Sequence, residues 1–135
     1  MEFRFFEIYR SSEYLSILSE GILTSAFLTI AAGILGFLVA NLLALARYWS
    51  VPVLSQIAAC LVEFFRNTPL IVQLFFFAFG LPLLLGYEWE FWQHALLALT
   101  VNFSAYFAEI LRAGFVSVSP HQSEAAAALG LRNGL

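Results

Sequence analysis

The sequence predicts an all-α membrane protein with three transmembrane spans and a short helix outside the membrane. Three observations predict this fold class. Of the 135 residues, 61% are hydrophobic and only 11% are charged, whereas about a quarter of a soluble domain is charged. Apolar stretches long enough to cross a bilayer recur along the chain. Aromatic residues and arginines flank these stretches, as they do at membrane interfaces.

The charged and reactive residues exclude several classes of function. Six Arg stand against nine Glu, a net charge of −3, which argues against nucleic acid as a partner. Cys60 has no second cysteine for a disulfide and is expected to be a small buried side chain. His94 and His121 lie in different regions. The sequence also lacks phosphate-loop, zinc-protease and serine-hydrolase motifs, so we expect no catalytic residue, metal or cofactor.

Residues 1–20 are expected to form an amphipathic segment at the extracytoplasmic face of the membrane. Glu and Arg alternate with aromatic residues over positions 2–13. No compact apolar region follows a basic start, so the segment does not resemble a secretory signal.

The first span of the transmembrane region 21–118 is expected at about residues 22–46, which carry no charge. At 1.5 Å per residue this helix is roughly 37 Å long, enough to cross a hydrocarbon core of about 30 Å. Arg47 and two aromatic residues follow it. Small residues at every fourth position form a face against which another helix can pack closely. These residues are Ala32, Gly36, Ala40 and Ala44.

The second span, about 53–85, is expected to be broken near Pro69. Proline lacks the backbone N–H group and disfavours helix at the residue before it. Thr68 can cap a new helix that starts after the break. We therefore expect one bent helix or two collinear helices, ended by Gly80 and Pro82.

Glu63 and Arg66 lie three residues apart on the polar face of this region. At that spacing the two side chains can form a local ion pair. Charges within a membrane usually face a helix bundle interior or a cavity, while at headgroup depth the same pair would aid solubility. The sequence leaves both interpretations open.

The third span is expected at about residues 94–116, after an aromatic and acidic loop. Asn102, Tyr106 and Glu109 share one face of it and are the candidate residues of a substrate pathway, because polar side chains in membrane helices commonly line such pathways. Glu109 could contact an ammonium group of a substrate or could pair with Arg112. The spacing favours the pairing.

A short helix is expected within residues 119–135. Ser119 can cap its start, Pro120 suits its first position, and Gly130 tolerates the left-handed conformation at its end. Four consecutive alanines, Ala125–Ala128, make it narrow enough for the groove of another protein. The alternative is a stable connector, because alanine is the best helix former.

The distribution of arginine predicts the orientation. Arg47 and Arg132 follow the first and third spans, whereas the loop 87–93 has two Glu and no basic residue. The positive-inside rule then places the Arg47 loop and the alanine-rich helix in the cytoplasm and the N-terminus outside.

Three motifs resemble those of the membrane subunits of bacterial ABC importers for polar amino acids, the histidine/glutamine/arginine-type permeases. Residues 63–74 are similar to that family's Glu-x-x-Arg-Gly-Thr-Pro-Leu-x-x-Gln stretch, and residues 102–114 to its Ala-Tyr-x-x-Glu-x-x-Arg-Gly segment. Glu124-Ala125-Ala126 with Gly130 resembles its Glu-Ala-Ala loop. The motif residues with an expected structural role are Glu63, Arg66, Thr68, Pro69, Gln73 and Arg112.

The resemblance implies a subunit of the bacterial inner membrane that does not itself hydrolyse ATP. Its partners would be a cytoplasmic ABC ATPase dimer, a second permease subunit, identical or related, and an extracytoplasmic amino-acid-binding protein. A groove of the ATPase would hold the coupling segment, and movement of that groove would be transmitted to the spans. The residues assigned to ATPase coupling in this way are Ser119, Pro120, Glu124, Ala125, Ala126 and Gly130.

The chain departs from the family pattern in two respects. Asn67 and Ala113 stand where the family often has glycine. The family also continues past the Glu-Ala-Ala loop with two more spans, so the 135 residues are not expected to transport a substrate alone. A non-ABC channel or secondary transporter, or a membrane scaffold that transports nothing, are the alternative functions.

Overall fold

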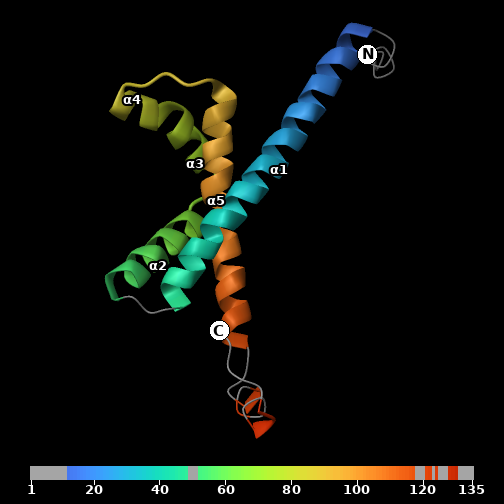
Figure 1. Ribbon diagram of the computed structural model, residues 1–135. Coiled ribbons are helices and arrows are strands. Elements are labelled where there is room, and N and C mark those ends of the chain that lie inside the picture. Colours follow the sequence, from blue (N-terminus) through green and yellow to red (C-terminus); the bar gives the residue numbers. More distant parts are fainter. Residues whose placement is uncertain (1–11, 49–51, 118–120, 123, 125–127, 131–135) are drawn as a thin grey trace, which may run out of the picture.

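A computed structural model describes residues 12–48, 52–117, 121–122, 124 and 128–130. Figure 1 shows that α1 and α5 cross near the middle of the molecule, with α2 and the α3–α4 segment diverging from the region of the crossing. The elements are α1 (Ser12–Tyr48), α2 (Pro52–Asn67), α3 (Leu70–Phe75), the π-helical segment η2 (Phe76–Gly80), α4 (Leu81–Leu85) and α5 (Phe91–Ser117).

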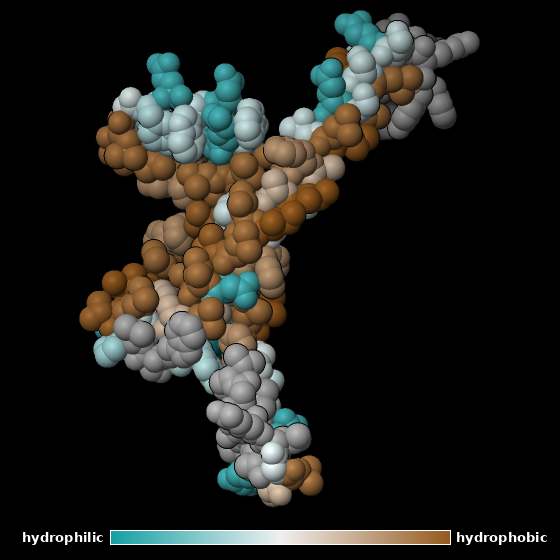
Figure 2. Space-filling model, in the orientation of Figure 1, coloured by the Kyte–Doolittle hydropathy of each residue, from teal (hydrophilic) through white to brown (hydrophobic). Residues whose placement is uncertain are grey.

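The helices confirm the predicted all-α membrane fold. Among the described residues, α1 and α5 are each long and apolar enough to cross a membrane, and the bent pair formed by α2 and 70–85 makes a third span if it is counted as one. Figure 2 shows hydrophobic residues over the middle of the molecule and hydrophilic ones near the start of α1 and beside α4. An apolar surface of this kind is suited to lipid.

The first span begins earlier than its uncharged stretch. α1 starts at Ser12, with Glu13 in its first turn, and continues as one helix to Tyr48. Of the segment expected at the membrane surface, residues 12–20 are therefore the first turns of α1 and residues 1–11 lie outside the described residues.

The small-residue face of α1 packs against α5, as the spacing of these residues predicts. Gly36 is at the closest approach, where an added Cβ atom would lie 2.9 Å from the Cβ of Phe103 and 3.2 Å from both the Thr100 carbonyl oxygen and the Ser104 nitrogen. Small residues of α5 are buried there too, so the two backbones can approach closely. The buried small residues are Ala32, Gly36, Ala40 and Ala44 of α1 and Ala98, Ser104, Ala105 and Ala108 of α5.

The break at Pro69 is a sharp bend, and the helices on its two sides are not collinear. The axes of α2 and of the segment 70–85 differ in direction by 105°. Pro69 has an extended backbone, with φ of −56° and ψ of 138°. The predicted cap by Thr68 is wrong, because its hydroxyl donates to the Phe64 carbonyl inside α2, at 2.7 Å. The Pro69 carbonyl starts α3 by accepting the N–H groups of Val72 and Gln73.

Gln73 stabilises this bend from inside. Its side chain is buried, and its amide nitrogen donates to the carbonyl oxygens of Phe65 at 2.7 Å and Thr68 at 2.9 Å. These carbonyls lie at the end of α2, where the next turn of helix no longer supplies donors. In turn the Asn102 amide of α5 donates to the Gln73 side-chain oxygen at 3.4 Å, which ties the bend to α5.

Replacing Gln73 by leucine is therefore expected to destabilise the bend. Two carbonyls would lose their donor in an apolar setting, at a cost of about 1–3 kcal/mol for each unsatisfied group. The free energy of unfolding, measured by denaturation in detergent, should fall by at least about 2 kcal/mol, the lower end of this range for two carbonyl groups. Gln56→Leu is the matched control, because Gln56 is exposed on α2; equal effects of the two changes would contradict the role of Gln73.

Gly80 and Pro82 do not end the helix, and this prediction is wrong. The helix widens to the π-helical segment η2, so that the Leu81 N–H group donates to the Phe76 carbonyl. The helix continues through Pro82 in α4 and ends before Gly86, which has a left-handed φ of 70°. Pro82 has no backbone N–H group to donate to the preceding turn. The wider π-helical turn before it allows the helix to continue in spite of this.

Cys60 is exposed, so its predicted burial is also wrong. α2 turns Ala58 and Val62 inward, and Val62 packs with Ala40 and Ala108 in the centre of the molecule. At about 100° per residue, a residue two positions from Val62 faces away from that centre. The apolar residues around Cys60 in the sequence do not show whether its side chain lies in the protein core or on the apolar outer surface.

Candidate functional site

The candidate site is a polar strip along one face of α5. It runs from the bend between α2 and α3 to the end of α1, and each of its three predicted residues contacts another helix. These residues are Asn102, Tyr106 and Glu109.

Asn102 is the buried end of the strip, with 7% of its surface exposed. Its amide nitrogen donates to Gln73 at the bend. Because that bond uses one donor of the amide, the remaining polar atoms of Asn102 are the ones that could bind another molecule.

Tyr106 is exposed and lies against the end of α2. Its hydroxyl donates to the backbone carbonyl of Arg66 at 3.4 Å, and the Arg66 guanidinium lies 5.8 Å from the centre of the tyrosine ring. This distance allows a cation–π interaction. In the described part of the chain Arg66 forms no ion pair with Glu63, so the local pair that the spacing allowed is absent.

Glu109 is the centre of a cluster of charged residues, which we call the arginine–glutamate cluster (Arg47, Arg66, Glu109 and Arg112). Arg112 donates to Glu109 Oε1 through Nε at 3.0 Å and also through Nη2, which confirms the predicted pairing. Arg47 of α1 donates to Oε2 at 2.9 Å. The Nη1 atom of Arg66 lies 3.9 Å from Oε2. One carboxylate therefore joins three helices.

Arg47 is the member of the cluster that sequence reasoning missed. Its position after the first span predicts an interfacial residue and indicates the orientation, but not a partner for Glu109. A usable signal was present, because Arg47 lies three residues after Ala44 and so continues the small-residue face that packs on α5. Its distance of 62 residues from Glu109 gave no local indication of the pair.

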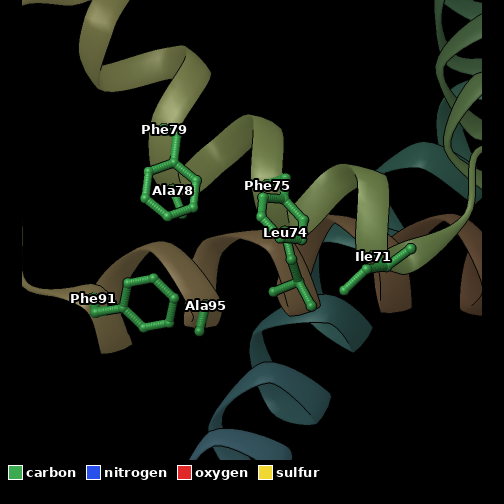
Figure 3. A pocket seen from close by; sticks show the side chains of 7 residues that line it. All are labelled: Ile71, Leu74, Phe75, Ala78, Phe79, Phe91 and Ala95. Carbon is green, nitrogen blue, oxygen red and sulfur yellow. The ribbon is translucent and has the colours of Figure 1, made fainter.

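A separate groove lies between α3, η2 and α5 and has a volume of about 250 Å³. Figure 3 shows its lining side chains, all of them apolar. A groove without polar groups does not match a polar ligand. The lining residues are Ile71, Leu74, Phe75, Ala78, Phe79, Phe91 and Ala95.

The expected coupling segment is described only in part. Glu124 is exposed, and its carboxylate lies 3.5 Å from the His121 ring. Gly130 has φ of 73°, which is the left-handed conformation expected at that position. Residues 119–120 and 125–126, which include the other assigned coupling residues (Ser119, Pro120, Ala125 and Ala126), lie outside the described residues.

Comparison with known proteins relates the chain to permeases. It is 40% identical over 121 residues to a probable glutamine ABC transporter permease protein of Bacillus subtilis, covering 90% of this chain and 55% of that protein. An arginine transport system permease protein of the same organism is 36% identical, with coverages of 85% and 52%. An L-cystine transport system permease protein is 30% identical, with coverages of 93% and 55%. No family model matches the chain.

The fold agrees with these relatives. A chain in a crystal structure of an amino acid ABC transporter with histidines superposes with a TM-score of 0.72 at 34% identity, covering 88% of this chain and 58% of that one. The chain thus spans about half the length of the curated relatives that it matches.

Proposed function

We propose, from its homology to permease subunits of amino-acid ABC transporters, that this chain forms part of the translocation pathway of an ATP-driven importer. The observation that carries the proposal is the 40% identity to a permease over 90% of the chain. The substrate class is a polar or charged amino acid, in keeping with relatives named for glutamine and arginine transport. Hydrolysis of ATP is assigned to a separate ATPase.

The polar strip supports this function. It offers an amide at Asn102, a phenolic hydroxyl at Tyr106 and charged groups around Glu109, on a helix that is otherwise mainly apolar. Polar groups of this kind within a membrane helix suit the passage of a polar solute. We assign Asn102, Tyr106 and Glu109 to the substrate pathway on this basis.

The proposed partners are a cytoplasmic ATPase dimer, a second permease subunit and an extracytoplasmic amino-acid-binding protein. The coupling segment, with Glu124 and Gly130 among its residues, would dock on the ATPase. This assignment requires the segment to be cytoplasmic and the N-terminus to lie outside the inner membrane of a bacterium, the orientation favoured by Arg47 and Arg132. A channel, a secondary transporter or a scaffold finds no support among the relatives.

Replacing Ala126 by arginine tests the coupling. A bulky charged side chain in a close groove should lower co-purification with the partner ATPase about tenfold or more, the effect of losing a contact worth about 2 kcal/mol. The control Ala126→Ser keeps a small side chain and should retain binding. The assay uses the chain co-expressed with a candidate partner ABC ATPase; undiminished binding by the arginine variant would refute the docking role.

A further inference from the structure

Arg66 is the member of the arginine–glutamate cluster whose guanidinium group is available to bind another molecule. Arg47 and Arg112 both donate hydrogen bonds to the Glu109 carboxylate. Arg66 lies 3.9 Å from the same carboxylate and donates no side-chain hydrogen bond within the described residues. Because 39% of its side-chain surface is exposed, its N–H donors can reach a ligand.

Tyr106 holds this guanidinium group on the polar face of α5. The tyrosine hydroxyl donates to the backbone carbonyl of Arg66 at 3.4 Å, and the guanidinium carbon lies 5.8 Å from the centre of the tyrosine ring. A charged group at membrane depth faces a polar interior or a cavity in preference to lipid. Arg66 therefore belongs with the polar strip and not with the apolar outer surface.

The charge balance of the cluster favours an anion at this position. Both oxygens of Glu109 already accept hydrogen bonds, Oε2 from Arg47 and Oε1 from Arg112. Even if the exposed Glu63, one turn before Arg66, is counted with the cluster, three positive charges stand against two negative ones. An ammonium group would be repelled here, whereas a negatively charged group would be attracted.

We propose that Arg66 binds the α-carboxylate of the transported amino acid, an inference that rests on the proposed function. The planar donor array of a guanidinium group matches the two oxygens of a carboxylate, and such charge-assisted pairs are stronger than neutral hydrogen bonds. The Asn102 side-chain oxygen, one turn of α5 before Tyr106, accepts no hydrogen bond in the described part of the chain. It is the neutral acceptor offered to the ammonium group of the same substrate.

This assignment gives Arg66 and Glu109 different roles. Glu109 fixes the other two arginines of the cluster, and Arg66 holds the part that every amino acid has in common. Selection among amino acid side chains would then depend on other residues of the pathway.

Ligand-observed NMR of the purified chain in lipid nanodiscs tests the assignment, with L-glutamine and 4-aminobutanamide as probes. The second compound is glutamine without its α-carboxylate, and the parent chain should bind it more weakly than glutamine. Arg66→Gln should lower the affinity for glutamine about tenfold, the effect of losing a hydrogen bond to a charged group. It should not lower the affinity for the amine. Arg66→Lys keeps the charge but not the planar donor array, so its loss should be smaller.

Arg10→Gln is the matched control, because it removes the same charge from the opposite end of α1. Arg10 lies two residues before Ser12, and the helix from Ser12 to Arg47 is roughly 52 Å long, far beyond the distance at which salt screens charges. Its affinity for glutamine should stay within about twofold of the parent. Circular dichroism verifies the fold, and Arg66→Lys carries the comparison if Arg66→Gln does not fold.

Three results would overturn the assignment. They are equal losses of glutamine affinity in the Arg10 and Arg66 variants, equal losses for glutamine and the amine in Arg66→Gln, and a parent chain that binds neither compound or binds both equally. Each of these results leaves the proposed function standing, because the co-purification of Ala126→Arg with an ATPase tests that function separately.

Discussion

Replacing Gly36 by alanine is expected to destabilise the packing of α1 on α5 by about 1–3 kcal/mol, the usual cost of overpacking. The added Cβ atom would lie 3.2 Å from two backbone atoms of α5 and 2.9 Å from the Cβ of Phe103. Neither backbone atoms nor a Cβ atom can move aside as the end of a flexible side chain can. The two helices must therefore separate.

Gly33→Ala is the control for that experiment. It makes the same chemical change on the same helix, but its added Cβ atom has no neighbour within 4 Å. Alanine exceeds glycine in helix propensity by about 1 kcal/mol, so this variant should be as stable as the parent or more stable. Unfolding in detergent with increasing SDS gives both values. A similar change in the two variants would show that close packing at Gly36 does not hold the crossing together.

Replacing Glu109 by glutamine is expected to reduce stability by about 2 kcal/mol, because hydrogen bonds to charged groups contribute about 1.5–3 kcal/mol. The change keeps the size of the side chain and removes the charge that Arg47 and Arg112 contact. The three arginines would then repel one another at the junction of three helices. The same denaturation experiment measures this loss.

A double-mutant cycle isolates the pair between α1 and α5. Arg47→Gln and Glu109→Gln should couple by about 1–2 kcal/mol, within the range for contacting residues. Glu63→Gln is the control, because Glu63 is exposed and forms no ion pair in the described structure; its own effect should stay within about 0.5 kcal/mol. Purely additive effects of the Arg47 and Glu109 changes would exclude a stabilising pair.

The Glu109→Gln variant also tests the substrate pathway. Introduced at the matching position of a full-length relative, it is expected to change uptake without abolishing assembly with the ATPase. A pathway role predicts that the change in uptake differs between cationic and neutral amino acids, which a purely structural role would not produce. Unaltered uptake of every substrate would remove Glu109 from the pathway.

The local sequence determined the helices and the small-residue face by which α1 packs against α5. The length and apolarity of the spans, the small-residue face of α1 and the pairing of Glu109 with Arg112 follow from composition and from helical spacing of three or four residues. These features depend on neighbours along one helix, and helical periodicity is the same in every fold.

The tertiary structure alone decided how the polar residues are used. Thr68 could cap a helix, yet its hydroxyl donates back into α2. The Gln73 side chain donates to a backbone carbonyl at the bend, and Asn102 donates to Gln73. Proline at 69 predicted a break but not its angle of 105°, and after the break α3 packs against α5.

Arg47 and Glu109 illustrate the physical reason most clearly. Each has ordinary local interpretations, as an interfacial charge and as a partner of Arg112. Their contact exists because α1 and α5 cross at small residues and bring together positions 62 residues apart. The strength of an ion pair depends on distance and burial, and both quantities are set by packing between helices and not by the sequence within either one.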